Sequence, residues 1–176
     1  MAVPAFLTLN RRETLEGKQT AAREILAEGV RTGPSQQANG VFSYGLSPAC
    51  AHYLDIALSE KAEELNVWAG RRGKRITSTT ILDKHPETFR LEQGHPMPTP
   101  DDCVAVVLPL SSAAVEVESK GDGDGDGDGD GAEATASARA MWEPEAAMLV
   151  AAGEAFSVVE GSTHFVYVLV RMEAAD

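Results

Sequence analysis

The sequence predicts an α+β fold, in which N-terminal helices precede a β-rich core of two packed sheets. Three observations support this class. Helical patterns occupy the first third of the chain, later segments are short and rich in β-branched residues, and turn residues separate those segments. With 176 residues, 43% of them apolar, the chain can bury a core as one domain. We therefore expect a single domain over residues 1–176, with a helical part over residues 1–65.

Two helices are expected in this first part. One covers residues 12–28, where apolar side chains share a face and Gly29 follows as a stop signal. The second starts at Ser47, whose hydroxyl suits an N-cap, with Pro48 at the first helical position. Apolar residues then recur at helical spacing as far as Leu65.

From residue 65 onward the pattern indicates strands. Seven short segments are bounded by Gly, Pro, Asp or Ser: residues 65–68, 75–82, 103–110, 114–118, 147–151, 155–159 and 163–171. The nearly continuous apolar run from Cys103 to Leu108 is typical of a strand covered on both faces. We expect the β core to comprise residues 66–119 and 141–172.

A low-complexity segment separates the two parts of this core. Residues 120–131 read KGDGDGDGDGDG, and small residues follow as far as Ala140. Alternating Gly and Asp combine backbone freedom with repelling charges and offer nothing to bury. Residues 120–140 are therefore expected to form a disordered insertion.

Composition limits the partners and the location. The net charge of −12 disfavours nucleic acid and anionic membrane surfaces. No segment reaches the roughly 20 apolar residues of a membrane span, and residues 1–30 lack signal-peptide features. We expect a soluble, monomeric protein, cytoplasmic or in another intracellular compartment, without membrane or nucleic-acid partners.

Cysteine and histidine usage gives no sign of a metal site. Cys50 and Cys103 lie far apart in apolar segments and are expected to be buried free thiols. The four histidines are scattered singly, without the spacing of zinc ligands. No metal site is predicted.

Three motifs occur in order along the β-rich part. Residues 66–70 read NVWAG, residues 76–80 read ITSTT, and residues 142–172 read WEPEAAMLVAAGEAFSVVEGSTHFVYVLVRM. In this order they resemble the arginine-type mono-ADP-ribosyltransferases, which carry an Arg-containing strand, a Ser-Thr-Ser strand and a Glu-x-Glu turn. The resemblance implies an ADP-ribosyltransferase-like β core.

The resemblance also implies a glycosyltransferase that uses NAD as co-substrate and modifies a protein side chain, with arginine as the expected acceptor. Cleavage of the nicotinamide–ribose bond creates an oxocarbenium-like centre, which a nearby carboxylate stabilises. The resemblance assigns that role to Glu145 and orientation of the acceptor to Glu143. Ser78 would hold Glu145 in place.

The first two motifs would bind NAD. Arg71 or Arg72 would contact the phosphates, because a planar guanidinium bonds two oxygens at once. Trp68, Thr79 and Thr80 complete the expected cofactor-binding set.

Alternatives remain open at these motifs. Counting from Gly153 puts Ala147 at the catalytic position, and Ala69 stands where the family has its arginine; both imply an inactive binding or interaction module on the same fold. Pairing Glu143 with Glu145 instead keeps a catalytic carboxylate. In an unrelated β-rich domain, the three motifs would not converge on one cleft.

Overall fold

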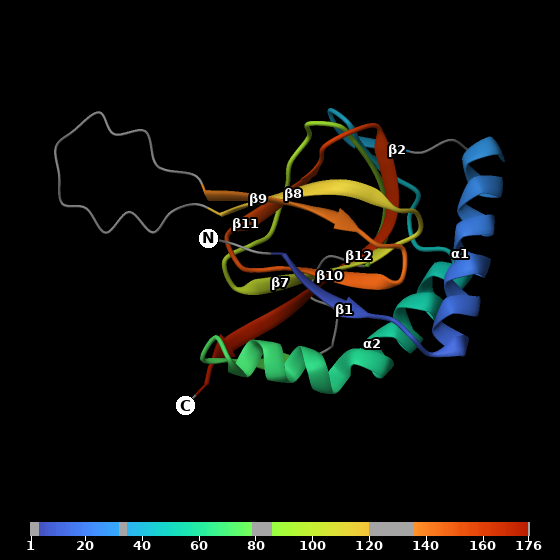
Figure 1. The fold of residues 1–176 in the computed structure, drawn as a ribbon. Helices are drawn as coiled ribbons and strands as arrows, with labels where there is room; N and C mark the ends of the chain where they lie inside the picture. Colours follow the sequence, from blue (N-terminus) through green and yellow to red (C-terminus); the bar gives the residue numbers. More distant parts are fainter. Residues whose placement is uncertain (1–3, 32–34, 79–85, 120–135, 176) are drawn as a thin grey trace, which may run out of the picture.

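The computed structural model describes residues 4–31, 35–78, 86–119 and 136–175. Within these ranges two helices and twelve strands form three layers (Figure 1). The helices cover one face of an eight-stranded main sheet, and a four-stranded small sheet covers the other face. This confirms a mixed α+β fold with two packed sheets.

The helices α1 (Arg12–Arg31) and α2 (Pro48–Gly70) begin where the sequence predicts. The Ser47 hydroxyl accepts a hydrogen bond from the amide of Cys50, as expected of an N-cap. The two helices are antiparallel, because Thr14 contacts Glu60 while Glu24 contacts Ser47. Neither described helix is long and apolar enough to cross a membrane.

The prediction of a strand at residues 65–68 is wrong, because this segment lies in the last turns of α2. Buried residues continue the helical spacing to the end of the helix: Lys61, Leu65, Trp68 and Ala69. The residues NVWAG are therefore helical, and the chain turns into the next strand only after Gly73.

The strands of the main sheet follow the order β1-β10-β7-β12-β5-β3-β2, and all of these pairs are antiparallel. Strand β5 pairs with the N-terminal part of β12, and β4 pairs antiparallel with its C-terminal part. These strands are β1 (Ala5–Thr8), β2 (Ser35–Ala38), β3 (Val41–Ser43), β4 (Lys74–Ser78), β5 (Glu87–Glu92), β7 (Cys103–Pro109), β10 (Ala146–Val150) and β12 (Ser162–Ala174). Every residue of β7 is buried, which confirms that this strand is covered on both faces.

The small sheet has the order β6-β11-β8-β9. Its strands are β6 (Met97–Pro98), β8 (Ala113–Ser119), β9 (Ala136–Trp142) and β11 (Glu154–Val158). Residues 136–140 therefore belong to β9, although the sequence analysis placed them in the disordered insertion. They pair with residues 115–119 of β8, which satisfies the hydrogen-bonding groups of their backbone. The small side chains of this segment do not reveal that pairing in the sequence. Residues 120–135 lie outside the described residues, so disorder there stays a prediction.

The N-terminal part is not purely helical. The strands β1, β2 and β3 lie within residues 1–65 and join the main sheet. Each has only three or four residues, too few to show a period in the sequence.

Apolar cores fill both faces of the main sheet. On β12, Val166 and Val168 face the helices, whereas Phe165 and Leu169 face the small sheet. We call these the helix-side core and the inter-sheet core. Each core contains one of the two cysteines, and both are buried free thiols, as predicted.

Candidate functional site

Three of the residues predicted to bind NAD, Trp68, Arg71 and Arg72, lie at the end of α2. The guanidinium carbon of Arg72 lies 3.9 Å from the centroid of the Trp68 ring, and Arg71 is exposed beside it. Ser78 is in β4, paired with Arg171 of β12. Thr79 and Thr80 lie outside the described residues.

The two predicted catalytic carboxylates lie in the turn between β9 and β10. Glu143 and Glu145 are exposed and line a groove of about 570 Å³ between two sheet edges, which we call the acidic groove. Phe6 and Thr8 of β1 and Met141 of β9 complete most of its lining.

A lysine contacts the same turn from α1. The Lys18 ammonium donates a hydrogen bond to the carbonyl oxygen of Pro144. Burial lowers the pKa of Lys18, while the nearby carboxylate of Glu145 opposes that shift. The turn is thus anchored to the helix layer.

The structure does not bring Glu145 and Ser78 together. The strand register puts the start of β10 level with Phe165 of β12, six positions before Arg171, the partner of Ser78. At about 3.3 Å per residue, the two sites are about 20 Å apart along the sheet. Ala147 is also not beside Ser78, because it pairs with Leu7 and packs in the helix-side core.

The largest of the described cavities is elsewhere, where the sequence analysis placed no function. It has a volume of about 620 Å³ and lies between strands β3, β5 and β12 of the main sheet and the segment 96–100. Its apolar walls include Val41, Phe89, Met97, Tyr167 and Leu169. We call it the β5 cavity.

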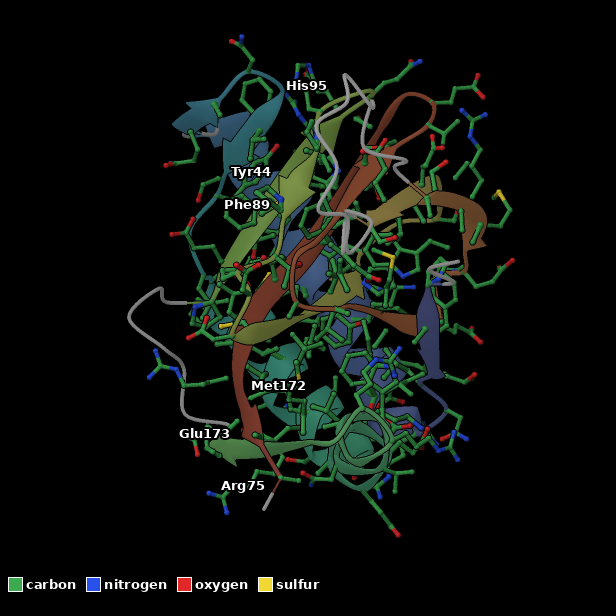
Figure 2. All side chains as sticks on the ribbon, turned by 90° about the vertical axis from the view of Figure 1, so that its left-hand side faces the viewer. Tyr44, Arg75, Phe89, His95, Met172 and Glu173 are labelled. Carbon is green, nitrogen blue, oxygen red and sulfur yellow. The ribbon has the colours of Figure 1, made fainter. Side chains whose placement is uncertain are left out.

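The strand register explains why these side chains meet. Glu87 pairs with Tyr167, and Phe89 pairs with Phe165, so alternate residues of β5 and β12 share the face toward the small sheet. Figure 2 shows Phe89 on the same half of the molecule as Tyr44 and His95, while Arg75 and Glu173 lie at the opposite end. Phe89, which lines the β5 cavity, thus lies toward the end of the molecule opposite Arg75 and Glu173.

One carboxylate lines this cavity. The Glu87 Oε2 atom accepts a hydrogen bond of 2.6 Å from the hydroxyl of Ser43, which is itself only 7% exposed. The Ser43 oxygen in turn accepts a hydrogen bond of 3.1 Å from the amide of Gly45. Among the described residues, no cation lies within ion-pair distance of Glu87.

The other polar side chains at the cavity are neutral: the carboxamide of Gln37, the Tyr167 hydroxyl and the nearby Thr99 hydroxyl. Burial raises the pKa of Tyr167 to about 12, although the neighbouring Thr99 hydroxyl acts in the opposite direction, so Tyr167 is uncharged at neutral pH. Thr99 is buried, and within the described part of the chain its Oγ1 has no hydrogen-bond partner of ordinary geometry. The Phe89 and Tyr167 rings meet edge to face, with centroids 5.9 Å apart.

The sequence analysis missed Glu87, Ser43 and Tyr167 as site residues. Strand β5 was not predicted, because its six residues ETFRLE mix charged and apolar side chains. The alternation of the apolar residues Phe89 and Leu91 with their polar neighbours is the local signal that indicates this strand. Its partner Tyr167 is 80 positions away, and only the fold brings them together.

No group of three or more His, Cys, Asp or Glu side chains in the described ranges is placed to hold a metal ion. The polar chemistry of the β5 cavity therefore comes from one carboxylate, one carboxamide and hydroxyl groups.

Comparisons with known proteins give a likeness of fold. No protein-family model matches the sequence. No curated protein matches it either. A crystal structure of a Pseudomonas putida prolyl-4-hydroxylase is similar, with a TM-score of 0.57 and 11% sequence identity over 96% of this chain and 91% of that chain. The Momordica charantia 7S globulin gives a TM-score of 0.37 at 11% identity, over 80% of this chain but 33% of that one.

Proposed function

We propose that this chain is a binding protein that holds a small, mostly apolar molecule in the β5 cavity. The observation that carries the proposal is the cavity itself, with about 620 Å³ of space between the main sheet and the segment 96–100. This volume falls within the roughly 300–1,000 Å³ of small-molecule sites, which combine apolar and aromatic walls with a few polar groups. The same combination lines this cavity. A binding protein is also the kind of non-catalytic function that the sequence left open as an alternative.

Binding of the neutral fluorophore N-phenyl-1-naphthylamine tests this proposal. The wild-type protein is expected to enhance its fluorescence saturably, because an apolar cavity excludes water from the dye. Val41→Trp fills the cavity from β3 and should abolish the enhancement. Leu26→Trp adds the same side chain at a position that is 67% exposed on α1, and should bind like the wild type. No saturable binding, or equal binding by both variants, would refute the proposal.

A second candidate is the NAD-dependent mono-ADP-ribosyltransferase activity that the motifs imply. One observation favours it: Glu143 and Glu145 line the same groove, where an acceptor side chain has room to enter. Arg71, Arg72 and Ser78 lie at the other end of the sheet, so catalysis in the acidic groove has to proceed without them. The β5 cavity is therefore the better supported site.

Release of nicotinamide from NAD, with agmatine as acceptor, tests this second candidate. Activity that is present in the wild type and lost in Glu145→Ala would support it. Glu118→Ala is the matched control, since Glu118 is exposed on β8 outside the acidic groove. An absence of nicotinamide release would exclude the transferase.

A further inference from the structure

We infer that the ligand of the β5 cavity is an organic cation, a protonated amine attached to an aromatic or branched apolar body. This inference rests on the proposed function, because it names the class of molecule that the same cavity takes. Three features carry it: a carboxylate with no cation near it among the described residues, two rings beside that carboxylate, and apolar walls beyond them.

The carboxylate of Glu87 has unused capacity to accept hydrogen bonds. It is half-buried and lines the cavity, and its cross-strand partner in the sheet, Tyr167, is neutral. A carboxylate has about four acceptor positions, and the Ser43 hydroxyl occupies one of them. A partly desolvated charge is costly unless an opposite charge approaches it, and no described cation does so.

Ser43 keeps this carboxylate in a fixed position. Its hydroxyl donates to Glu87, and its oxygen accepts from the backbone of Gly45, so the hydroxyl proton is committed to the carboxylate. A group whose orientation is fixed in advance loses less freedom when a ligand binds. The arrangement thus favours recognition of a donor at one defined place.

The two rings add attraction for a positive charge. Tyr167 is directly opposite Glu87 in the strand register, and the Cβ atoms of such pairs are about 5 Å apart. Phe89 is two positions further along the same face of β5, about 7 Å from Glu87 along the strand. A cation bound at the Glu87 carboxylate is therefore near both rings. Aromatic rings attract a cation that lies within about 6 Å of the ring centroid.

Apolar walls accommodate the rest of the ligand. Val41, Met97 and Leu169 offer no charge, and Pro96, Pro98 and Pro100 contribute no backbone donors. An anionic ligand would meet the Glu87 carboxylate with no described cation to balance it. The net charge of −12 also repels anions and attracts cations at long range.

Three molecules of similar shape test the inference. Binding of 2-phenylethylamine, 2-phenylethanol and phenylacetate is measured by calorimetry and by displacement of N-phenyl-1-naphthylamine. The amine is expected to bind about tenfold more tightly than the alcohol, the size of effect that a charge-assisted hydrogen bond provides. Phenylacetate should bind more weakly than either.

Paired variants locate the effect. Glu87→Gln keeps the shape of the side chain but removes its charge, so the amine and the alcohol should bind equally. Glu92→Gln is the control on the same strand, because Glu92 lies on the opposite face of β5 and pairs with Arg90. It should retain the preference for the amine. Thermal unfolding of both variants shows whether each remains folded.

The outcomes separate the inference from the proposed function. If the dye binds but the amine and the alcohol bind equally, the cationic ligand is refuted and the binding function stands. A preference that survives in folded Glu87→Gln also refutes it. If neither the dye nor any of the three molecules binds, both proposals fail.

Discussion

At the scale of single residues, two glutamates connect the helices, because each helix carries a glutamate that binds the N-terminal end of the other helix. The Glu60 carboxylate of α2 accepts hydrogen bonds of 2.9 and 3.3 Å from the amides of residues 10 and 11, just before α1, and one of 2.5 Å from the Thr14 hydroxyl. The Glu24 carboxylate of α1 accepts hydrogen bonds from the Ser47 hydroxyl and from the first turn of α2. Each helix thus supplies the negative charge that the other helix N-terminus favours.

The contribution of Glu60 to stability should depend on pH. Burial acts to raise the pKa of Glu60, but hydrogen bonds from Thr14, Asn10, Arg11 and Lys61 outweigh it and lower the pKa below its usual 4.5. Because the folded state binds the proton less tightly than the unfolded state, this contribution is complete above the unfolded pKa. It is lost as the pH falls through the folded value.

Glu60→Gln tests both statements. At pH 7 this variant is expected to lower the free energy of unfolding by about 1–3 kcal/mol, since it removes a charged acceptor from several donors. The difference from the wild type should narrow as the pH falls from 5 to 3. Urea denaturation across this pH range measures it, with Glu63→Gln at an exposed position of α2 as the control. A difference that stays constant with pH would contradict the linkage.

At the scale of secondary-structure elements, strand β9 and the turn that follows it depend on one buried indole. The Trp142 ring packs against Phe156 and Phe165, with centroids 6.4 and 6.0 Å away. Its Nε1 donates a hydrogen bond of 2.8 Å to the carbonyl oxygen of Ala146, across the turn. The side chain therefore fixes the start of β10 relative to the inter-sheet core.

Substitutions at Trp142 should separate these two contributions. Trp142→Phe removes the hydrogen bond and part of the ring, and should cost about 1–3 kcal/mol, whereas Trp142→Ala should cost about 3–5 kcal/mol. The neighbouring Met141 is 62% exposed, so Met141→Ala should change stability by less than about 0.5 kcal/mol. Chemical denaturation of the three variants gives the comparison, and equal losses at positions 141 and 142 would contradict it.

Elements with strong local signals were the ones that could be predicted. The start of α2 has its cap at Ser47 and its proline at position 48, and β7 is apolar throughout because both of its faces are covered. The end of α2 was mistaken for a strand because Val67 and Trp68 favour strands locally, whereas packing on the helical face decided the outcome.

The candidate site could not be predicted in the same way. Glu87, Ser43 and Tyr167 come from three strands, and only the register of β3, β5 and β12 brings them together. Glu143 and Glu145 do share a groove, but Ser78 is held at the other end of β12 by its pairing with Arg171. Distances of this kind are properties of the sheet order rather than of any motif.

At the scale of the whole molecule, one sheet serves two cores. The central strands β7 and β12 send alternate side chains to the helix-side core and to the inter-sheet core. The strands β1 and β2 lie at the two ends of the strand order, and each has a single partner. Stability should therefore decrease from the centre of the main sheet to its edges.

Amide hydrogen exchange tests this gradient. The amides of β7 and of the part of β12 paired with it should exchange last, near the rate set by global unfolding. Those of β1 and β2 should exchange earlier, through local opening. Mass spectrometry of peptides covering these strands provides the measurement. Protection in β2 that equals protection in β7 would rule out the gradient.

The position of β12 in the sheet also affects the order in which the protein can assemble. This strand follows every other described strand in the sequence, yet it lies between β7 and β5 and also pairs with β4. During synthesis, at about 5–20 residues per second, those three strands have to wait for their shared partner with unpaired edges. Folding dominated by such distant pairings takes milliseconds to seconds. The nascent chain is therefore exposed to aggregation until β12 is made, because β4, β5 and β7 still lack their shared partner.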